Sequence, residues 1–193
     1  MGVEFELKYA ITGEILEAVC REFPGQWKQI TMETTYYDTP SGSLSARRYT
    51  LRTRLENGVS VCTVKTPAQD GSRGEWEITE THMEAAIPIL CKLGAPEDLL
   101  LLTQEGIVPV CGARFTRLAQ SVPAEDAVIE LALDRGILFA GDAQIPLCEL
   151  EAELKSGSRE TAVAFAKSLA QKYALQPEPK SKFRRALELN KER

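Results

Sequence analysis

The sequence lacks the features that define several large classes of protein. No apolar run approaches the roughly 20 residues that a membrane-spanning helix needs. The first ten residues carry acidic side chains where a secretory signal has a basic start and an apolar core. There is also no GxxxxGK[ST] motif and no GxGxxG motif, which excludes a P-loop and a dinucleotide-binding turn. We therefore expect a cytoplasmic protein that has no membrane partner.

Histidine and closely spaced cysteines are scarce as well. His82 is the single histidine, in a polar stretch typical of a helix start, which disfavours a hydrolase built on a histidine base. The five cysteines are widely and irregularly spaced and include no CxxC pair: Cys20, Cys62, Cys91, Cys111 and Cys148. They are expected to be reduced core residues, and a structural zinc site is excluded because its ligands would have to cluster.

An excess of positive charge is also missing. The chain has 23 Lys and Arg against 28 Asp and Glu, which gives a net charge of −5. Such a balance offers no bulk attraction to nucleic acid, so no nucleic-acid partner is expected and any anion site must be local. With 193 residues, 44% of them hydrophobic, and no repeat or linker, residues 1–193 are expected to form one domain.

What the sequence does contain is strict alternation of polar and apolar residues, the pattern of strands with two different faces. In the first such segment Glu4, Glu6 and Lys8 share one face. Asn57-Gly58 predicts a tight hairpin turn between two further segments. The strands predicted in this way are 3–9, 49–56, 60–66, 73–78, 129–134 and 148–155.

Amphipathic helices are predicted between these strands. Thr12 is a candidate N-cap, and Pro24-Gly25 ends the first helix. The predicted helical ranges are 12–23, 84–93, 96–104, 158–173 and a basic last helix, 181–190. A strand-rich chain with peripheral helices indicates an α+β protein.

The charged strand faces are unusual in being of one sign. Glu149, Glu151 and Glu153 point the same way at intervals of roughly 7 Å, which is self-repulsive on a bare strand. A solvated outer face would explain any one such strand. Taken together, the acidic faces and the basic pair Arg52 and Arg54 favour a closed sheet with both inside. We expect an antiparallel β-barrel of about eight strands, its interior open to a ligand and its outside covered by helices.

The residue types of such an interior indicate its chemistry. Glu4 and Glu6 opposite Glu149 and Glu151 would form a hard oxygen-ligand set suited to Mg²⁺ or Mn²⁺. Arginine and lysine side chains bind phosphate oxygens. A site with both groups predicts a metal-bound polyanion, most naturally a polyphosphate.

The ordered motifs of the chain resemble those of one family. They are Glu4-Phe5-Glu6-Leu7-Lys8 (ExExK), Tyr36-Tyr37-Asp38-Thr39-Pro40, Leu51-Arg52-Thr53-Arg54, Thr63-Val64-Lys65, the ExE of Glu75 and Glu77, IELALDRG at 129–136, CELEAELKSG at 148–157, and Ser181-Lys182-Phe183-Arg184-Arg185. In this order and spacing the chain resembles the CYTH family, also called triphosphate tunnel metalloenzymes, and especially its bacterial inorganic triphosphatases. The resemblance implies an eight-stranded antiparallel tunnel, a divalent metal on the glutamates and a triphosphate bound by the basic residues. A CHAD domain, frequent in bacterial relatives, is not expected in this chain.

These observations together assign roles to the charged residues. The expected metal ligands are Glu4, Glu6, Glu149, Glu151 and Asp134, and the expected catalytic residues are Glu149, Glu151, Glu153 and Lys8. The residues expected to bind substrate are Lys8, Arg52, Arg54, Lys65, Arg117 and Lys182; Glu75 and Glu77 could order these basic groups or lie near the metal. Arg114 is a weaker candidate, and Glu130 could order basic groups or lie near the metal. No serine, cysteine or histidine nucleophile is evident, so water is the expected attacking group.

Several functions remain open at this stage. The leading one is hydrolysis of inorganic triphosphate, a small-molecule substrate. The alternatives are a thiamine or nucleoside triphosphatase, a class IV adenylate cyclase, and a polyphosphate sensor without turnover. Class IV adenylate cyclases of this family typically carry a His-Phe pair close to the ExExK motif. Here only Met1-Gly2-Val3 precedes Glu4, so the cyclase is disfavoured. Because confined like charges cost stability, Glu151→Gln is expected to leave the stability of the ligand-free protein unchanged or to raise it.

Overall fold

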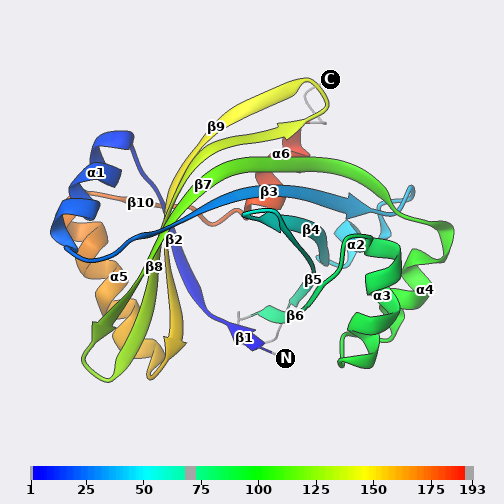
Figure 1. Ribbon diagram of the computed structural model, residues 1–193, viewed down its shortest axis with the longest axis horizontal. Helices are drawn as coiled ribbons and strands as arrows, with labels where there is room; N and C mark the ends of the chain where they lie inside the picture. Colours follow the sequence, from blue (N-terminus) through cyan, green and yellow to red (C-terminus); the bar gives the residue numbers. More distant parts are fainter. Residues whose placement is uncertain (1, 68–72, 190–193) are drawn as a thin grey trace.

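One antiparallel sheet of ten strands dominates the fold (Figure 1). The computed structural model describes residues 2–67 and 73–189, with side chains from Phe5 onward. The strand order is β1-β6-β5-β4-β3-β7-β8-β9-β2-β10. The strands are β1 (Gly2–Glu4), β2 (Glu6–Ala10), β3 (Lys28–Asp38), β4 (Thr50–Glu56), β5 (Val59–Pro67), β6 (Arg73–Thr79), β7 (Val108–Ala124), β8 (Ala127–Ala140), β9 (Ala143–Ser156) and β10 (Gln176–Pro177).

The prediction of a closed eight-stranded barrel is wrong. Within the described residues β1 and β10 form the two ends of the sheet, and each pairs with a single neighbour, β6 and β2 respectively. The segment predicted as one strand, 3–9, is interrupted at Phe5, so that β1 pairs with β6 while β2 pairs with β9. Alternation fixes which face of a strand is polar, but closure depends on the tilt and stagger of all strands, which the pattern does not carry. The sheet is instead an open arch with a concave side (Figure 1).

Local sequence accounts for the hairpins of this sheet. Asn57 and Gly58 both have positive φ, 49° and 87°, and they join β4 to β5 with Glu56 opposite Val59. This is the two-residue turn that Asn-Gly predicts. The longest strands, β7, β8 and β9, form a meander in which Arg117 is opposite Asp134 and Asp134 is opposite Glu149. That register places three of the candidate site residues side by side.

The predicted helices are present with small changes of boundary. They are α1 (Gly13–Glu22), α3 (Met83–Lys92), α4 (Asp98–Leu102) with a 3-10 turn (Thr103–Glu105), α5 (Arg159–Tyr173) and α6 (Lys182–Glu188); α2 (Ser43–Ala46) was not predicted. Thr12 and Ser158 cap α1 and α5, each accepting a hydrogen bond from a backbone N–H. No helix in the described part of the chain is long and apolar enough to cross a membrane.

Three apolar clusters hold the helices to the sheet. Helices α1 and α5 pack on β2, β8 and β9 around Val19 and Leu133, and α3 and α4 pack on β4–β6 around Leu51 and Leu90. The expectation that helices cover the apolar outer faces is confirmed for these four. Helix α6 differs, because its Phe183 packs with apolar side chains that also line the concave side, among them Ile30, Met32 and Phe115.

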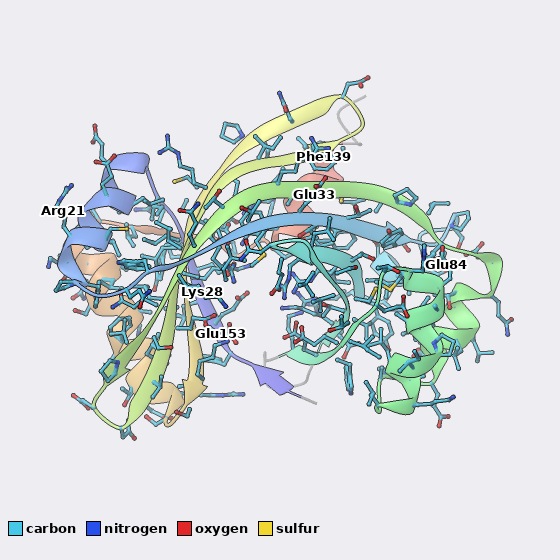
Figure 2. The ribbon with its side chains drawn as sticks, in the orientation of Figure 1. Arg21, Lys28, Glu33, Glu84, Phe139 and Glu153 are labelled. Atoms are coloured by element: carbon cyan, nitrogen blue, oxygen red, sulfur yellow. The ribbon has the colours of Figure 1, made fainter. Side chains whose placement is uncertain are left out.

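The two faces of the sheet differ in chemistry. Glu33 and Phe139 lie along the convex side, whereas Glu153 points into the concave space (Figure 2). On the convex side Arg114 contacts both of these residues, with its Nε 3.2 Å from Glu33 Oε1 and its guanidinium 4.6 Å from the centre of the Phe139 ring. The concave side carries the charged residues singled out from the sequence.

Candidate functional site

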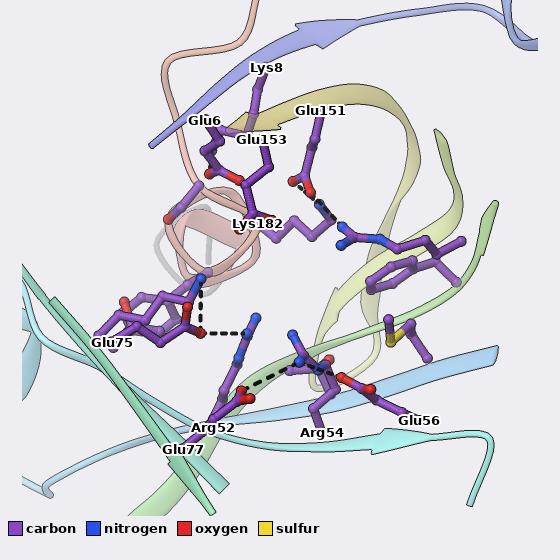
Figure 3. Close-up of a pocket in the computed structure, with 18 of the residues that line it drawn as sticks. Glu6, Lys8, Arg52, Arg54, Glu56, Glu75, Glu77, Glu151, Glu153 and Lys182 are labelled. Atoms are coloured by element: carbon purple, nitrogen blue, oxygen red, sulfur yellow. Dashed lines mark hydrogen bonds and ion pairs between the residues drawn. The ribbon is translucent and has the colours of Figure 1, made fainter. Parts of the chain in front are cut away.

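The concave side of the sheet encloses a cavity of about 330 Å³, which we call the inner cavity. Its walls come from opposite ends of the sheet, as Figure 3 shows, with Glu6, Glu151 and Glu153 on one side and Arg52 and Arg54 on the other. Its lining includes nine cationic side chains, namely Lys8, Lys28, Arg52, Arg54, Lys65, Arg73, Arg117, Lys155 and Lys182, and seven carboxylates, namely Glu6, Glu56, Glu75, Glu77, Glu130, Glu151 and Glu153. The cavity is therefore built for a ligand that is itself highly charged.

A row of three glutamates crosses the acidic wall. Glu153 on β9 is paired in register with Glu6 on β2 and with Glu130 on β8, and all three line the inner cavity. Lys155 Nζ lies 2.9 Å from Glu153 and 3.4 Å from Glu130, and Lys8 Nζ lies 3.7 Å from Glu6. Like charges directly opposite one another destabilise a sheet, and these two lysines offset part of the repulsion. We call these three carboxylates the glutamate row.

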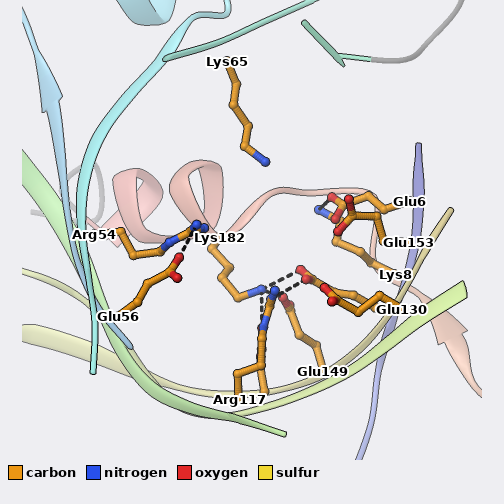
Figure 4. A network of polar contacts seen from close by, with 12 residues as sticks. Glu6, Lys8, Arg54, Glu56, Lys65, Arg117, Glu130, Glu149, Glu153 and Lys182 are labelled. Carbon is orange, nitrogen blue, oxygen red and sulfur yellow. Dashed lines mark hydrogen bonds and ion pairs between the residues drawn. The ribbon is translucent and has the colours of Figure 1, made fainter. Parts of the chain in front are cut away.

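Deeper in the same wall lies a buried acidic trio, Asp134, Glu149 and Glu151. One carboxylate oxygen from each lies within 4.8 Å of the others, close enough for the three to hold a metal ion. Lys182 Nζ contacts all three, at 2.8 Å from Asp134 and 2.7 Å from Glu151, with Glu149 as the third partner. Figure 4 shows Lys182 beside Glu149 and Arg117. Arg117 donates two hydrogen bonds of 2.7 Å to Asp134 and a third to Glu151. The trio has the hard-ligand chemistry of a metal site, but the protein supplies its own cations there.

Burial and charge pairing shift the titration of this cluster. Burial opposes the charge of Glu151, but Lys182 and Arg117 outweigh it and hold the pKa of Glu151 well below its usual range. The pKa of Glu149 is raised, because its burial and the neighbouring Glu151 outweigh Lys182 and Arg185. Burial opposes the charge of Lys182 too, yet the surrounding carboxylates raise its pKa. The pairing thus favours the charged forms of Glu151 and Lys182, whereas burial disfavours the charged form of Glu149.

The opposite wall carries the basic residues Arg52, Arg54 and Lys65. Glu75 Oε1 lies 3.3 Å from Lys65 Nζ and 3.6 Å from Arg52, so one carboxylate is shared by two cations. Arg54 contacts Glu56 and lies 3.9 Å from Glu77. Burial and the neighbouring Arg52 lower the pKa of Arg54, which remains far above neutrality for a guanidinium. Crowded guanidinium groups facing a cavity are the arrangement that binds a polyanion.

Most of the residues predicted from the sequence meet in this one place. Lys8, Arg52, Arg54, Lys65, Glu75, Glu77, Arg117, Lys182, Glu6, Glu151 and Glu153 all line the inner cavity. Asp134 and Glu149 lie behind the wall with no exposed surface; Asp134 is paired with Arg117 and Glu149 with Lys182. Arg114 is on the convex side. The side chain of Glu4 lies outside the described residues.

The sequence reasoning missed several parts of the site. Arg185 contacts Glu149 and lies 3.5 Å from Glu178, so it closes the back of the trio. Lys28, Arg73 and Lys155 also line the cavity. So do apolar side chains from β3, β7 and α6, namely Ile30, Met32, Tyr36, Phe115 and Phe183. Ile30, Met32 and Tyr36 recur at even positions, with Thr34 as the one polar member of that face, and this partial alternation is the signal that could have predicted the strand.

Comparison with known proteins agrees with this geometry. Residues 2–187 match the CYTH domain. The inorganic triphosphatase of Haemophilus influenzae is 28% identical over 172 residues, which cover 86% of this chain and 49% of that protein. The chain thus spans about half the length of this curated relative.

Solved structures with the same fold cover nearly the whole chain. The HpAC1 protein from Hippeastrum, reported with a dominant triphosphatase activity, superposes with a TM-score of 0.63 at 16% identity, over 95% of this chain and 93% of that one. The PH1819 protein from Pyrococcus horikoshii gives a TM-score of 0.63 at 22% identity, over 96% and 98% of the two chains. At these identities the likeness shows the fold.

Proposed function

The chain belongs to the CYTH domain family, and on that premise we propose that it is a divalent-metal-dependent triphosphatase. Its substrate would be inorganic triphosphate, hydrolysed to pyrophosphate and phosphate. The observation that carries the proposal is the pairing, across one cavity, of the glutamate row with the basic wall of Arg52, Arg54 and Lys65. The similarity to a protein named inorganic triphosphatase gives it independent support.

The glutamate row is the proposed metal site. Glu6 and Glu153 are register partners that face the cavity, and carboxylate oxygens are the ligands that Mg²⁺ and Mn²⁺ prefer. Glu4, expected from the ExExK motif, would add a third. When bound, the metal would offset charge on the phosphate oxygens. The buried trio, which the sequence also offered, remains the second candidate, because a metal there would have to displace Lys182.

The remaining groups account for binding and attack. Arg52, Arg54 and Lys65 would hold the phosphates in line, because phosphoryl transfer is catalysed mainly by positioning and charge stabilisation. Glu130, at the end of the glutamate row, is proposed to orient a water molecule and accept its proton. The water oxygen forms a bond to the terminal phosphorus, and the bridging P–O bond breaks to release pyrophosphate. The buried trio, with Lys182 and Arg117, would hold the wall of the cavity in place.

Phosphate release from triphosphate tests this function. Purified protein should release phosphate with Mg²⁺ or Mn²⁺ and stop when EDTA is added, while pyrophosphate, ATP and thiamine triphosphate are compared at the same concentration. Arg52→Ala protein prepared in the same way controls for contaminating phosphatases. Binding of triphosphate at micromolar concentration without release would replace the enzyme by a sensor. Faster release from ATP or thiamine triphosphate would replace the substrate.

A further inference from the structure

A second, larger hollow of about 690 Å³ adjoins the inner cavity. The two share a wall of six residues, Glu6, Lys8, Thr50, Arg73, Ser181 and Phe183, at the start of α6. A ligand in the inner cavity can therefore continue past Ser181 without leaving the protein surface. We call this hollow the vestibule.

The vestibule is strongly basic. Arg48, Lys180 and Arg184 line it in addition to the shared Lys8 and Arg73, and Glu6 is the carboxylate among its described lining residues. Glu188, which lies outside the lining, is 2.7 Å from Lys180 Nζ and 3.1 Å from Arg184 Nε. One carboxylate thus holds two cations side by side and leaves a net positive charge. An extended anion is the ligand that such a surface attracts.

Arg48 adds an independent observation. It follows α2 with a φ of 61°, in the left-handed region that glycine adopts without cost. Its backbone N–H donates a hydrogen bond of 2.9 Å to Ser45, as a tight reversal requires. An arginine in this conformation costs stability that a glycine would not, so folding alone does not account for the side chain. The residue lines the vestibule, where its guanidinium adds to the positive charge.

We propose that the vestibule binds the fourth and later phosphates of a linear polyphosphate whose terminal phosphates lie in the inner cavity. The proposal rests on the function proposed above and extends it from triphosphate to longer chains. Each added internal phosphate brings one more negative charge, and the arginines and lysines of the vestibule would meet it. Triphosphate would fill the inner cavity without reaching Arg48, Lys180 or Arg184.

Chain length provides the test. The kcat/KM for linear tetraphosphate and for triphosphate would be measured in wild type, Arg48→Gly and the double variant Lys180→Ala/Arg184→Ala. Both variants should lose about fivefold on tetraphosphate, the effect of an exposed charge pair of about 1 kcal/mol, and stay within about twofold of wild type on triphosphate. Arg48→Gly should fold at least as stably as wild type, because glycine suits the backbone there. Lys92→Ala removes one exposed charge at the end of α3, outside both cavities, and should leave both kcat/KM values unchanged.

Three results would overturn the proposal. An unchanged ratio of the two kcat/KM values would remove the vestibule from binding. An equal loss on both substrates would reduce its charges to general attraction. If kcat/KM were measured for ATP as well and the variants lost it on ATP alone, the vestibule would bind a nucleoside, with Tyr49 and Phe183 as its aromatic contacts. If wild type hydrolysed neither polyphosphate, the proposed function would fail. Calorimetry would then give the dissociation constants of triphosphate and tetraphosphate in the same variants, and an unchanged ratio of the two would show that the vestibule does not bind the fourth phosphate.

Discussion

Lys182 places its ammonium nitrogen 2.7 Å from Glu151 Oε1, at the centre of three carboxylates and with little access to solvent. The lysine comes from the first turn of α6, and Glu151 comes from β9. Burial of either charge alone would cost free energy, and the ion pair between Lys182 and Glu151 offsets part of that cost. The contact therefore joins the last helix to the sheet and fixes the acidic wall of the inner cavity.

Removal of this lysine should destabilise the fold strongly. We expect Lys182→Met to lower the free energy of unfolding by about 3 kcal/mol, because it leaves buried carboxylates without their main partner. Lys180→Met, which removes an exposed lysine paired with Glu188, should cost less than about 1 kcal/mol. Urea unfolding of the two variants without ligand provides the comparison. Equal, small losses would show that Lys182 does not support the wall.

The stability of the protein should also depend on pH through Glu151. Its pKa in the folded protein is below the ordinary value of about 4.3, so the unfolded chain binds the proton first as the pH falls. The stability that Glu151 contributes is then present above the unfolded pKa and is lost as the pH falls toward the folded pKa. The difference in unfolding free energy between wild type and Glu151→Gln should shrink from about pH 6 to about pH 3. A constant difference would mean that Glu151 is not selectively stabilised as a carboxylate.

The basic wall should govern substrate affinity. Arg54→Ala removes a guanidinium that lines the inner cavity, and kcat/KM for triphosphate should fall at least about tenfold, which is about 1.4 kcal/mol. Arg114→Ala removes the same group from the convex side, where it contacts Glu33, and should leave kcat/KM within about twofold. Steady-state kinetics at fixed ionic strength separate the two. Similar losses in both variants would refute the assignment of the substrate to the concave side.

The glutamate row should set the metal requirement. Glu153→Gln keeps the shape of the side chain but removes a negative charge, so the metal concentration for half-maximal activity should rise at least about tenfold. Glu33→Gln, on the convex side, should leave it unchanged. Titration of activity with Mn²⁺ gives both values. If Glu153→Gln had no effect and Glu149→Gln raised the requirement, the metal would belong to the buried trio.

Much of the fold could be predicted from local sequence, because local signals fix local structure. The Asn57-Gly58 turn and the Thr12 cap are found where they were predicted, and the helix predicted from Ser158 begins there, with Ser158 as its cap. Strands β3 and β7 were not predicted: along β3 the apolar face of Ile30, Met32 and Tyr36 is interrupted by Thr34, so the alternation is weaker than on the charged strands. The closed barrel was wrong because the break at Phe5 and the pairing of distant strands are decided by tertiary geometry.

The candidate site was predicted in composition better than in detail. Alternation placed Arg52, Arg54 and Glu153 on cavity-facing sides, where they lie. It could not tell which charges pair, because pairing joins strands and a helix that are far apart in the chain. Glu151 is the clearest case. From the sequence, Glu151→Gln was expected to leave the stability of the ligand-free protein unchanged or to raise it. In the structure Glu151 contacts Lys182 and Arg117, so we now expect the substitution to lower stability.

Hydrolysis of triphosphate in ¹⁸O-labelled water, followed by ³¹P NMR, tests the central claim most directly. The proposed attack of water on the terminal phosphorus predicts pyrophosphate and phosphate in equal amounts, with the ¹⁸O label in the phosphate. The reaction should require a divalent metal and should be lost in Arg52→Ala protein. No release in the presence of Mg²⁺ and Mn²⁺, or release with the label in pyrophosphate, would contradict the account.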